Sequence, residues 1–275
     1  MSMFFETMKN RCLSFFTTIC TILAFVDMFW SISSLYPDTT SKVVLIVLIV
    51  LISVMLSYVS IWLCGVKTIK CGNKRLIIRY GNLLKIKSPI KAFAVNRCFD
   101  TLVDDKVISK ESLHGQWVLR NYENRIARLN ELIHSSLYEQ NERPEKVLSR
   151  KEKPKGNLER YRVGAIVSIC CSPKEEYYLL GLTEMNANLN THCSSDDYVS
   201  AMQNLFNYYS IHGQGKDIAI SLIGSGAMSR LGKDKQDMLA IMVSLLKLYS
   251  DSLTGDVTIV LSKRDRNRIV VDSIH

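Results

Sequence analysis

The sequence lacks the short motifs that usually hold zinc. Its 275 residues include eight cysteines, but no two of them form a Cys-x-x-Cys pair, and no His and Cys have the spacing of zinc ligands. Isolated histidines are more often surface or core residues than metal ligands. We therefore expect no metal site and no cofactor, and we expect free thiols in a reducing compartment.

Aromatic residues are scarce where positive charge is densest. The formal net charge of +9 comes largely from two basic clusters, one just after residue 66 and one within 143–162. No aromatic side chain precedes Tyr161 in the second cluster, so nucleic-acid bases would find little to stack on there. The pattern argues against nucleic acid as a partner. It favours a solvated linker or hairpin, with an acidic lipid surface as the alternative.

Two apolar runs near the N-terminus are long enough to cross a bilayer. They cover about 13–35 and 43–64, and about 22 residues at 1.5 Å each match the hydrocarbon thickness. The first run lacks a small-residue cleavage site and is too long for a secretory signal. A short turn containing Pro37 joins the runs. We therefore predict a transmembrane hairpin over 1–66 and a second domain over 67–275.

Charges that flank the apolar runs predict their orientation. Lys9 and Arg11 precede the first run and a basic cluster follows the second, whereas the connecting turn has only Lys42. The positive-inside rule then places both termini in the cytoplasm. Asp27 lies within the first run, and Trp30 marks the headgroup level. Asp27 either faces a pore or an oligomer contact, or lies close enough to the interface to reach water.

Strands and helices alternate through the second domain. This alternation, with short apolar strands late in the chain, predicts an α/β fold with a mixed, partly parallel sheet. Ligands of such sheets bind at the C-terminal ends of strands. The predicted strands cover 75–82, 90–96, 161–171, 176–185, 217–223, 256–262 and 267–274. The predicted helices cover 117–140, 195–213 and 233–250.

A glycine-rich turn, SLIGSGAMSRLG (221–232), connects a predicted strand to a predicted helix. Gly224 and Gly226 permit positive φ and close approach of a ligand to the backbone. Amides in such a turn bind phosphate, helped by the dipole of the next helix. The alternative is a plain tight turn. The candidate ligand-binding residues are Ile223, Gly224, Ser225, Gly226, Ala227, Met228, Ser229 and Arg230.

Two better-known phosphate motifs do not match this turn. A Walker A motif has one residue fewer between its glycines, and its lysine is followed by Ser or Thr, whereas Asp234 follows Lys233. A dinucleotide fingerprint requires a third glycine where this chain has Ser229.

A polar loop follows the predicted strand 90–96. We expect it to share a sheet edge with the glycine-rich turn, where its Asp and Asn side chains would bind ribose hydroxyls and Phe99 would stack on a base or ribose. The alternative is a solvated acidic loop with an ordinary surface histidine. The candidate residues are Asn96, Phe99, Asp100, Thr101, Asp104, Asp105, Ser112, His114 and Gly115.

These segments together resemble the macro domain, a module that binds ADP-ribose. Gly81-Asn82-Leu83 stands where that family has a G-D-I-type turn, with Asn82 in place of the acid that contacts adenine. Val95-Asn96 begins the counterpart of the family's V-N-A-A-N loop, and 223–228 matches its diphosphate loop. The resemblance implies a three-layer α/β/α fold and an ADP-ribose derivative as ligand. It adds Asn82 and Leu83 to the candidates.

The predicted hairpin together with FDTLVDD, SLHG and IGSGAMSRLG resembles the membrane-anchored macro-domain effectors of Thoeris anti-phage defence. The resemblance implies a TIR-domain partner that makes a nucleotide signal, ADP-ribose joined to histidine. Binding would drive homo-oligomerisation, and the hairpins would disrupt the bacterial inner membrane and abort the infection. One alternative is an ADP-ribosyl hydrolase that activates water with Asp100, Asp104, Asp105 or His114. Another is a constitutive membrane scaffold.

Overall fold

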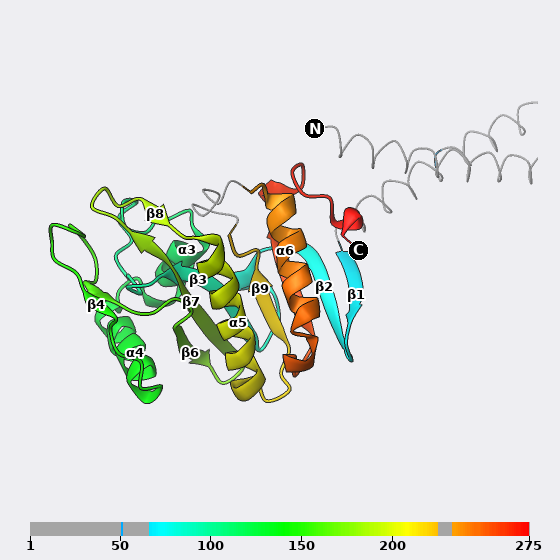
Figure 1. Ribbon diagram of the computed structural model, residues 1–275, viewed down its shortest axis with the longest axis horizontal. Coiled ribbons are helices and arrows are strands. Elements are labelled where there is room, and N and C mark those ends of the chain that lie inside the picture. Colours follow the sequence, from blue (N-terminus) through cyan, green and yellow to red (C-terminus); the bar gives the residue numbers. More distant parts are fainter. Residues whose placement is uncertain (1–50, 52–65, 225–232, 275) are drawn as a thin grey trace, which may run out of the picture.

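A mixed β-sheet with helices on both faces forms the centre of the molecule (Figure 1). This computed structural model describes residues 51, 66–224 and 233–274. Within these residues the sheet has eight strands, with seven in the order β1-β2-β10-β9-β3-β7-β6 and β8 paired to β7. The α/β class and the mixed sheet predicted from the sequence are confirmed.

Five neighbouring strands of the sheet are parallel to one another, and the edge strands β1 and β6 are antiparallel to their neighbours. The parallel strands are β2 (Lys74–Gly81), β10 (Val257–Ser262), β9 (Ile218–Ser221), β3 (Ile90–Asn96) and β7 (Glu175–Met185). The others are β1 (Val66–Cys71), β6 (Ile166–Ser172) and β8 (Thr191–His192). The C-terminal ends of the parallel strands therefore share one edge of the sheet.

Two helices cover each face and bury separate apolar cores. On one face lie α5 (Ser195–His212) and α6 (Lys235–Leu248), and on the other lie α3 (Leu113–Tyr122) and α4 (Ile126–Glu139). Local capping sets the helix ends. A capping box between Ser194 and Asp197 begins α5, and Gly213 caps its C-terminus. This three-layer arrangement is the one that the resemblance implied.

Three elements differ from the sequence-based prediction. The helix predicted over 117–140 is two helices, because Arg125 adopts non-helical dihedral angles between them. The basic stretch that follows residue 66 is the edge strand β1. The strand predicted over 267–274 is irregular and includes a 3₁₀ turn, Val271–Ser273, because Ile269 and Val271 are buried without joining the sheet. The alternating apolar residues that suggested a strand in this segment are explained by burial of their side chains, without strand pairing.

The basic stretch that was predicted to be a linker or hairpin is a hairpin. Strands β4 (Lys146–Val147) and β5 (Glu159–Arg160) pair in antiparallel fashion and are joined by a long loop. We call residues 141–161 the strap.

Nearly all of the predicted transmembrane hairpin lies outside the described residues, including Asp27 and Trp30. Among the residues that the structure does describe, none of the helices has the length and apolar character needed to cross a bilayer.

Candidate functional site

The candidate segments converge on one edge of the sheet. Asn82 follows β2, Asn96 ends β3, and Ile223 and Gly224 follow β9. Strand β9 lies between β3 and β10, and β10 pairs with β2, all in parallel. The expectation that the glycine-rich turn and the loop after β3 share an edge is therefore correct.

The backbone conformation at Gly224, in the turn after β9, favours glycine. Gly224 has a φ of +89°, and a Cβ there would lie 2.4 Å from Cε of Met238 on α6. Ile223 is buried, and its carbonyl accepts a 3.5 Å hydrogen bond from Tyr198. The other candidates of this turn lie outside the described residues, namely Ser225, Gly226, Ala227, Met228, Ser229 and Arg230. Helix α6 begins soon afterwards, capped by Asp234.

Asn96 organises the turn that follows β3. Its side chain is buried, and Oδ1 accepts hydrogen bonds from the amides of Cys98 (3.1 Å) and Asp100 (3.3 Å). Phe99 has a φ of +48°, which is uncommon for a residue with a bulky side chain. Its ring is 1% exposed and packs edge-on against Tyr161. Phe99 therefore faces the core, and the prediction that it stacks on a ligand is corrected.

Asp100 is enclosed in an ion pair instead of lying open to ribose. Its Oδ2 is 2.5 Å from Nζ of Lys153 in the strap, and both side chains are 0% exposed. Lys153 also donates to the carbonyl of Asn157 (2.8 Å). The backbone amide of Asn157 in turn donates to Oδ1 of Asp100. Burial raises the pKa of Asp100, and the Lys153 ammonium opposes that shift. Most residues around Lys153 are charged, so the sequence held no signal that its side chain is buried.

The next three polar residues hold the loop in shape. The hydroxyl of Thr101 donates to Oδ1 of Asn130 on α4 (2.8 Å). Asp104 accepts from nearby backbone amides and from Lys155 (3.0 Å). These bonds, led by the one from the amide of residue 107, lower the pKa of Asp104 to about 2. Asp105 accepts from the amide of residue 110 (2.8 Å).

Two further candidates cap short helical segments. Asn82 is exposed and its side chain accepts from the amide of Leu84, which caps a 3₁₀ turn (2.9 Å). Ser112 accepts from the amide of Gly115 and caps α3 (2.9 Å). Gly115 packs closely on the preceding loop, because a Cβ there would lie 2.2 Å from the carbonyl oxygen of Ser109. Of these side chains, only that of Asn82 is exposed at the edge.

The last two candidates face the core. Leu83 is buried. His114 is half-buried, and its ring lies 6.0 Å from that of Phe93 and 6.4 Å from that of Trp117. Burial lowers the pKa of His114 to about 4, so the imidazole is neutral near pH 7. Within the described residues, no group of three His, Cys, Asp or Glu side chains is arranged to hold a metal ion.

A second buried cation links the strap to the end of β3. Arg97 forms ion pairs with Glu145 of the strap and Glu184 of β7, and its Nε donates to the carbonyl of Tyr161 (2.8 Å). Arg160 also pairs with Glu184 (2.8 Å). Sequence reasoning missed this network, because its members lie up to 87 positions apart.

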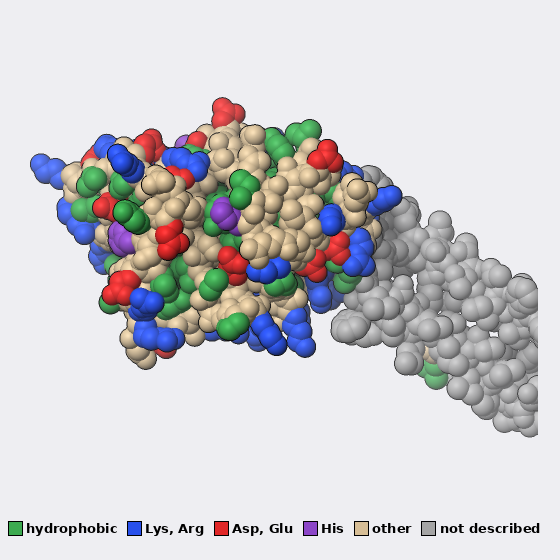
Figure 2. Space-filling view, turned by 90° about the horizontal axis from the view of Figure 1, so that it is seen from below, with side chains coloured by type: hydrophobic (Ala, Val, Ile, Leu, Met, Phe, Trp, Pro, Cys, Tyr) green, Lys and Arg blue, Asp and Glu red, His purple; other side chains and the backbone are tan. Residues whose placement is uncertain are grey.

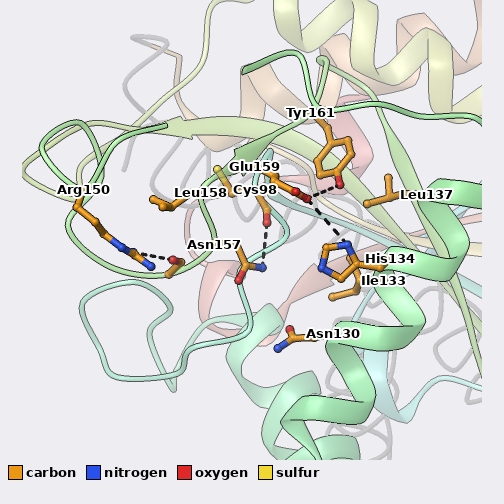
Figure 3. Close-up of a pocket in the computed structure, with 11 residues that line it drawn as sticks. Cys98, Asn130, Ile133, His134, Leu137, Arg150, Asn157, Leu158, Glu159 and Tyr161 are labelled. Atoms are coloured by element: carbon orange, nitrogen blue, oxygen red, sulfur yellow. Dashed lines mark hydrogen bonds and ion pairs between the residues drawn. The ribbon is translucent and has the colours of Figure 1, made fainter. Parts of the chain in front are cut away.

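A cavity of about 330 Å³ lies between α4 and the strap (Figure 3). Ile133 and Leu137 of α4 contribute apolar surface, whereas Arg150 and Glu159 contribute charge. Asn157 borders the cavity, and its side-chain Nδ2 donates to the carbonyl of Cys98 (3.2 Å; Figure 3). The same Nδ2 donates to the carbonyl of Phe99 (3.0 Å). The strap therefore binds both the backbone of the turn after β3, through Asn157, and the Asp100 side chain of that turn, through Lys153.

Macrodomains have the same fold. The structure is similar to the Oceanobacillus iheyensis macrodomain with MES bound, with a TM-score of 0.50 and 13% identity over 74% of this chain and 92% of that one. The same macrodomain with ADP gives a TM-score of 0.50 and 14% identity over 73% of this chain and 90% of that one. At these identities the likeness establishes the fold alone, which is that of a macro-type α/β/α domain.

The sequence comparisons identify the branch of this class. The family model for the macro domain of Thoeris protein ThsA matches residues 76–262. Thoeris protein ThsA from Bacillus amyloliquefaciens (strain Y2) is 23% identical over 263 residues, which cover 92% of this chain and 82% of that protein. The chain therefore belongs to the Thoeris ThsA macro-domain family. The resemblance drawn from the sequence is confirmed at this level.

Proposed function

We propose that this chain senses an ADP-ribose derivative through its macro domain and acts at the membrane as an anti-phage effector. The observation that carries the proposal is the shared sheet edge, where the turn at Gly224 and the turn at Asn96 follow neighbouring parallel strands. Family membership and the ADP bound in the Oceanobacillus iheyensis macrodomain add support.

The diphosphate would lie over the glycine-rich turn. Gly224 turns the backbone at the end of β9 and lies close to Met238 near the start of α6, so the positive end of that helix dipole is close to this region. Asn82, exposed after β2, stands where the family's adenine contact is expected. The loop held by Asn96 and the strap would close the cleft beside the ribose.

Ligand binding would act through assembly. In this proposal a TIR-domain partner produces the signal, which we infer to be histidine-linked ADP-ribose. A ligand drives a change only when it binds one state more tightly than the other. The bound state would be a homo-oligomer that gathers the predicted hairpins, including Asp27, in the inner membrane and breaches it. Its support is the family match and the two apolar runs of the sequence.

Hydrolysis is the second candidate function. It requires a side chain that is free to activate water. Asp100 is held by Lys153, the oxygens of Asp104 and Asp105 accept backbone hydrogen bonds, and His114 lies against core aromatics. These contacts favour a binding role. Release of labelled ADP-ribose from modified protein by the full chain would instead establish catalysis.

The test is calorimetric titration of the full chain in lipid nanodiscs. The ligands are ADP-ribose, NAD, cyclic ADP-ribose and histidine-linked ADP-ribose, with mass followed by light scattering. Gly226→Val is expected to weaken binding by at least about tenfold. The control is Gly215→Val. Valine strains the backbone there, because φ is +75°, but Gly215 precedes β9 at the opposite edge and has nothing within 4 Å of its Cβ position, so ligand binding should be unaffected. Failure of all four ligands to bind would refute the proposal.

A further inference from the structure

The start of β1 marks the side of the domain that faces the predicted membrane span. Val66 begins β1 two residues after the predicted span 43–64 ends. An extended residue covers at most about 3.6 Å, so Val66 lies within about 7 Å of the end of that span along the chain. Whatever surrounds Val66 in the fold is therefore close to the bilayer surface.

The C-terminal segment folds over this same corner. It leaves β10 at Ser262, which pairs with Gly81 at the end of β2, and runs across the edge to the start of β1 (Figure 1). The hydroxyl of Tyr80 donates to the carbonyl of Ile269 (2.6 Å), and Lys67 donates to the carbonyl of Ile274. Segments about 200 positions apart thus lie side by side.

The basic side chains of the segment KRDRNR (263–268) are exposed to solvent. Lys263, Arg264, Arg266 and Arg268 are exposed, and Arg79, opposite Val66 in the β-ladder, is exposed as well. We call these five residues the basic corner.

The acidic residue of this segment turns inward. Asp265 is buried and pairs with Lys235 at 2.5 Å. The exposed Arg264 pairs with the exposed Glu111 at 3.0 Å, a contact that water and salt weaken. The fold therefore buries the one acidic residue of KRDRNR and leaves the basic residues around it at the surface.

We propose that the basic corner docks on anionic phospholipid headgroups. Each Lys or Arg near such a surface adds to the attraction, which is screened beyond about 8 Å at physiological salt. Lipid fits better than nucleic acid, because residues 263–274 contain no aromatic side chain for base stacking. The proposal rests on the membrane placement in the proposed function.

Docking at this corner would orient the ligand site. Asn96 ends β3, and Asn82 and Gly224 follow β2 and β9, at the same edge of the sheet as Ser262. A docked domain would therefore hold its nucleotide cleft toward the bilayer. The opposite edge, which faces the viewer in Figure 2, shows basic and acidic side chains interspersed.

The experiment measures hydrogen exchange of the full chain in nanodiscs. One set contains phosphatidylcholine only and the other contains about one quarter phosphatidylglycerol. We expect amides of residues 263–274 to exchange at least about fivefold more slowly with the anionic lipid, and the protection to vanish at high salt. The variant Lys263→Glu/Arg268→Glu is expected to abolish it. Lys174→Glu/Lys216→Glu, exposed at the opposite edge, changes the net charge equally and is expected to retain it.

Equal exchange on both lipids, or protection that survives in Lys263→Glu/Arg268→Glu, would overturn the inference. So would protection by an RNA oligonucleotide and not by anionic lipid. ADP-ribose titration and carbonate extraction of the same samples separate this result from the proposed function. A chain that binds ADP-ribose and resists extraction, yet shows no lipid-dependent protection, refutes the docking alone.

Discussion

Lys153 and Asp100 form an ion pair that no solvent reaches, although the two residues lie 53 positions apart. Nζ of Lys153 is 2.5 Å from the carboxylate, and both side chains are completely buried. The pair joins the strap to the turn that follows β3, so the shape of that turn depends on a hairpin that is distant in the sequence.

Removing the buried ammonium should destabilise the domain strongly. Lys153→Met leaves the Asp100 carboxylate buried without its partner, which typically costs about 3–5 kcal/mol of unfolding free energy. Adding Asp100→Asn to that variant should recover part of the loss, because no unpaired charge stays buried. Thermal and denaturant unfolding measure both effects. Lys151→Met, two positions away and exposed, is the control. Equal stability of Lys153→Met and Lys151→Met would contradict the prediction.

Gly156 should tolerate alanine much less well than Gly215 does. Both have positive φ, +80° and +75°. A Cβ at Gly156 would lie 2.1 Å from Oδ1 of Asp100, whereas the Gly215 position has nothing within 4 Å. Gly215→Ala should therefore cost only backbone strain, about 1 kcal/mol, and Gly156→Ala at least twice that. Comparable unfolding midpoints for the two variants would argue against the close packing of the strap on the turn.

Acid should destabilise the folded chain through His114. Its folded pKa is about 4, below the unfolded value of about 6.5, so the unfolded state binds a proton first as the pH falls. The stability that this residue contributes is intact above pH 6.5 and declines toward pH 4, by about 3 kcal/mol for a shift of this size. His114→Gln should flatten the pH dependence of the unfolding midpoint. His192→Gln, at an exposed position, is the control.

Asn96 should matter for ligand affinity beyond its role in the turn. Asn96→Ala leaves the amides of Cys98 and Asp100 without their acceptor, and we expect about a tenfold loss of ADP-ribose affinity. Asn186 offers a matched control, because its Oδ1 also accepts from the amides two and four residues later. Asn186→Ala should disturb its own turn with little effect on the titration. Equal losses in both variants would count against a site at the end of β3.

Some features of the site could be predicted because they depend on local chain geometry. The strand–turn–helix order around Gly224 follows from an apolar run, a glycine and a helix-capping Asp234. The orientation of Phe99 could not be predicted in this way. An aromatic residue in a polar loop suggests stacking on a ligand, but the positive φ at Phe99 turns the ring toward Tyr161 and the core.

The sequence by itself determined the α/β class, the family, and the need for glycine after β9, because periodicity, motif spacing and backbone sterics act over a few residues. Only the tertiary structure decided which lysine of the strap is buried and where KRDRNR lies. Lys151, Lys153 and Lys155 have the same immediate chemistry, and only Lys153 meets a buried carboxylate. Strand order brings residues 263–274 beside Val66, and that order depends on packing between segments far apart in the chain.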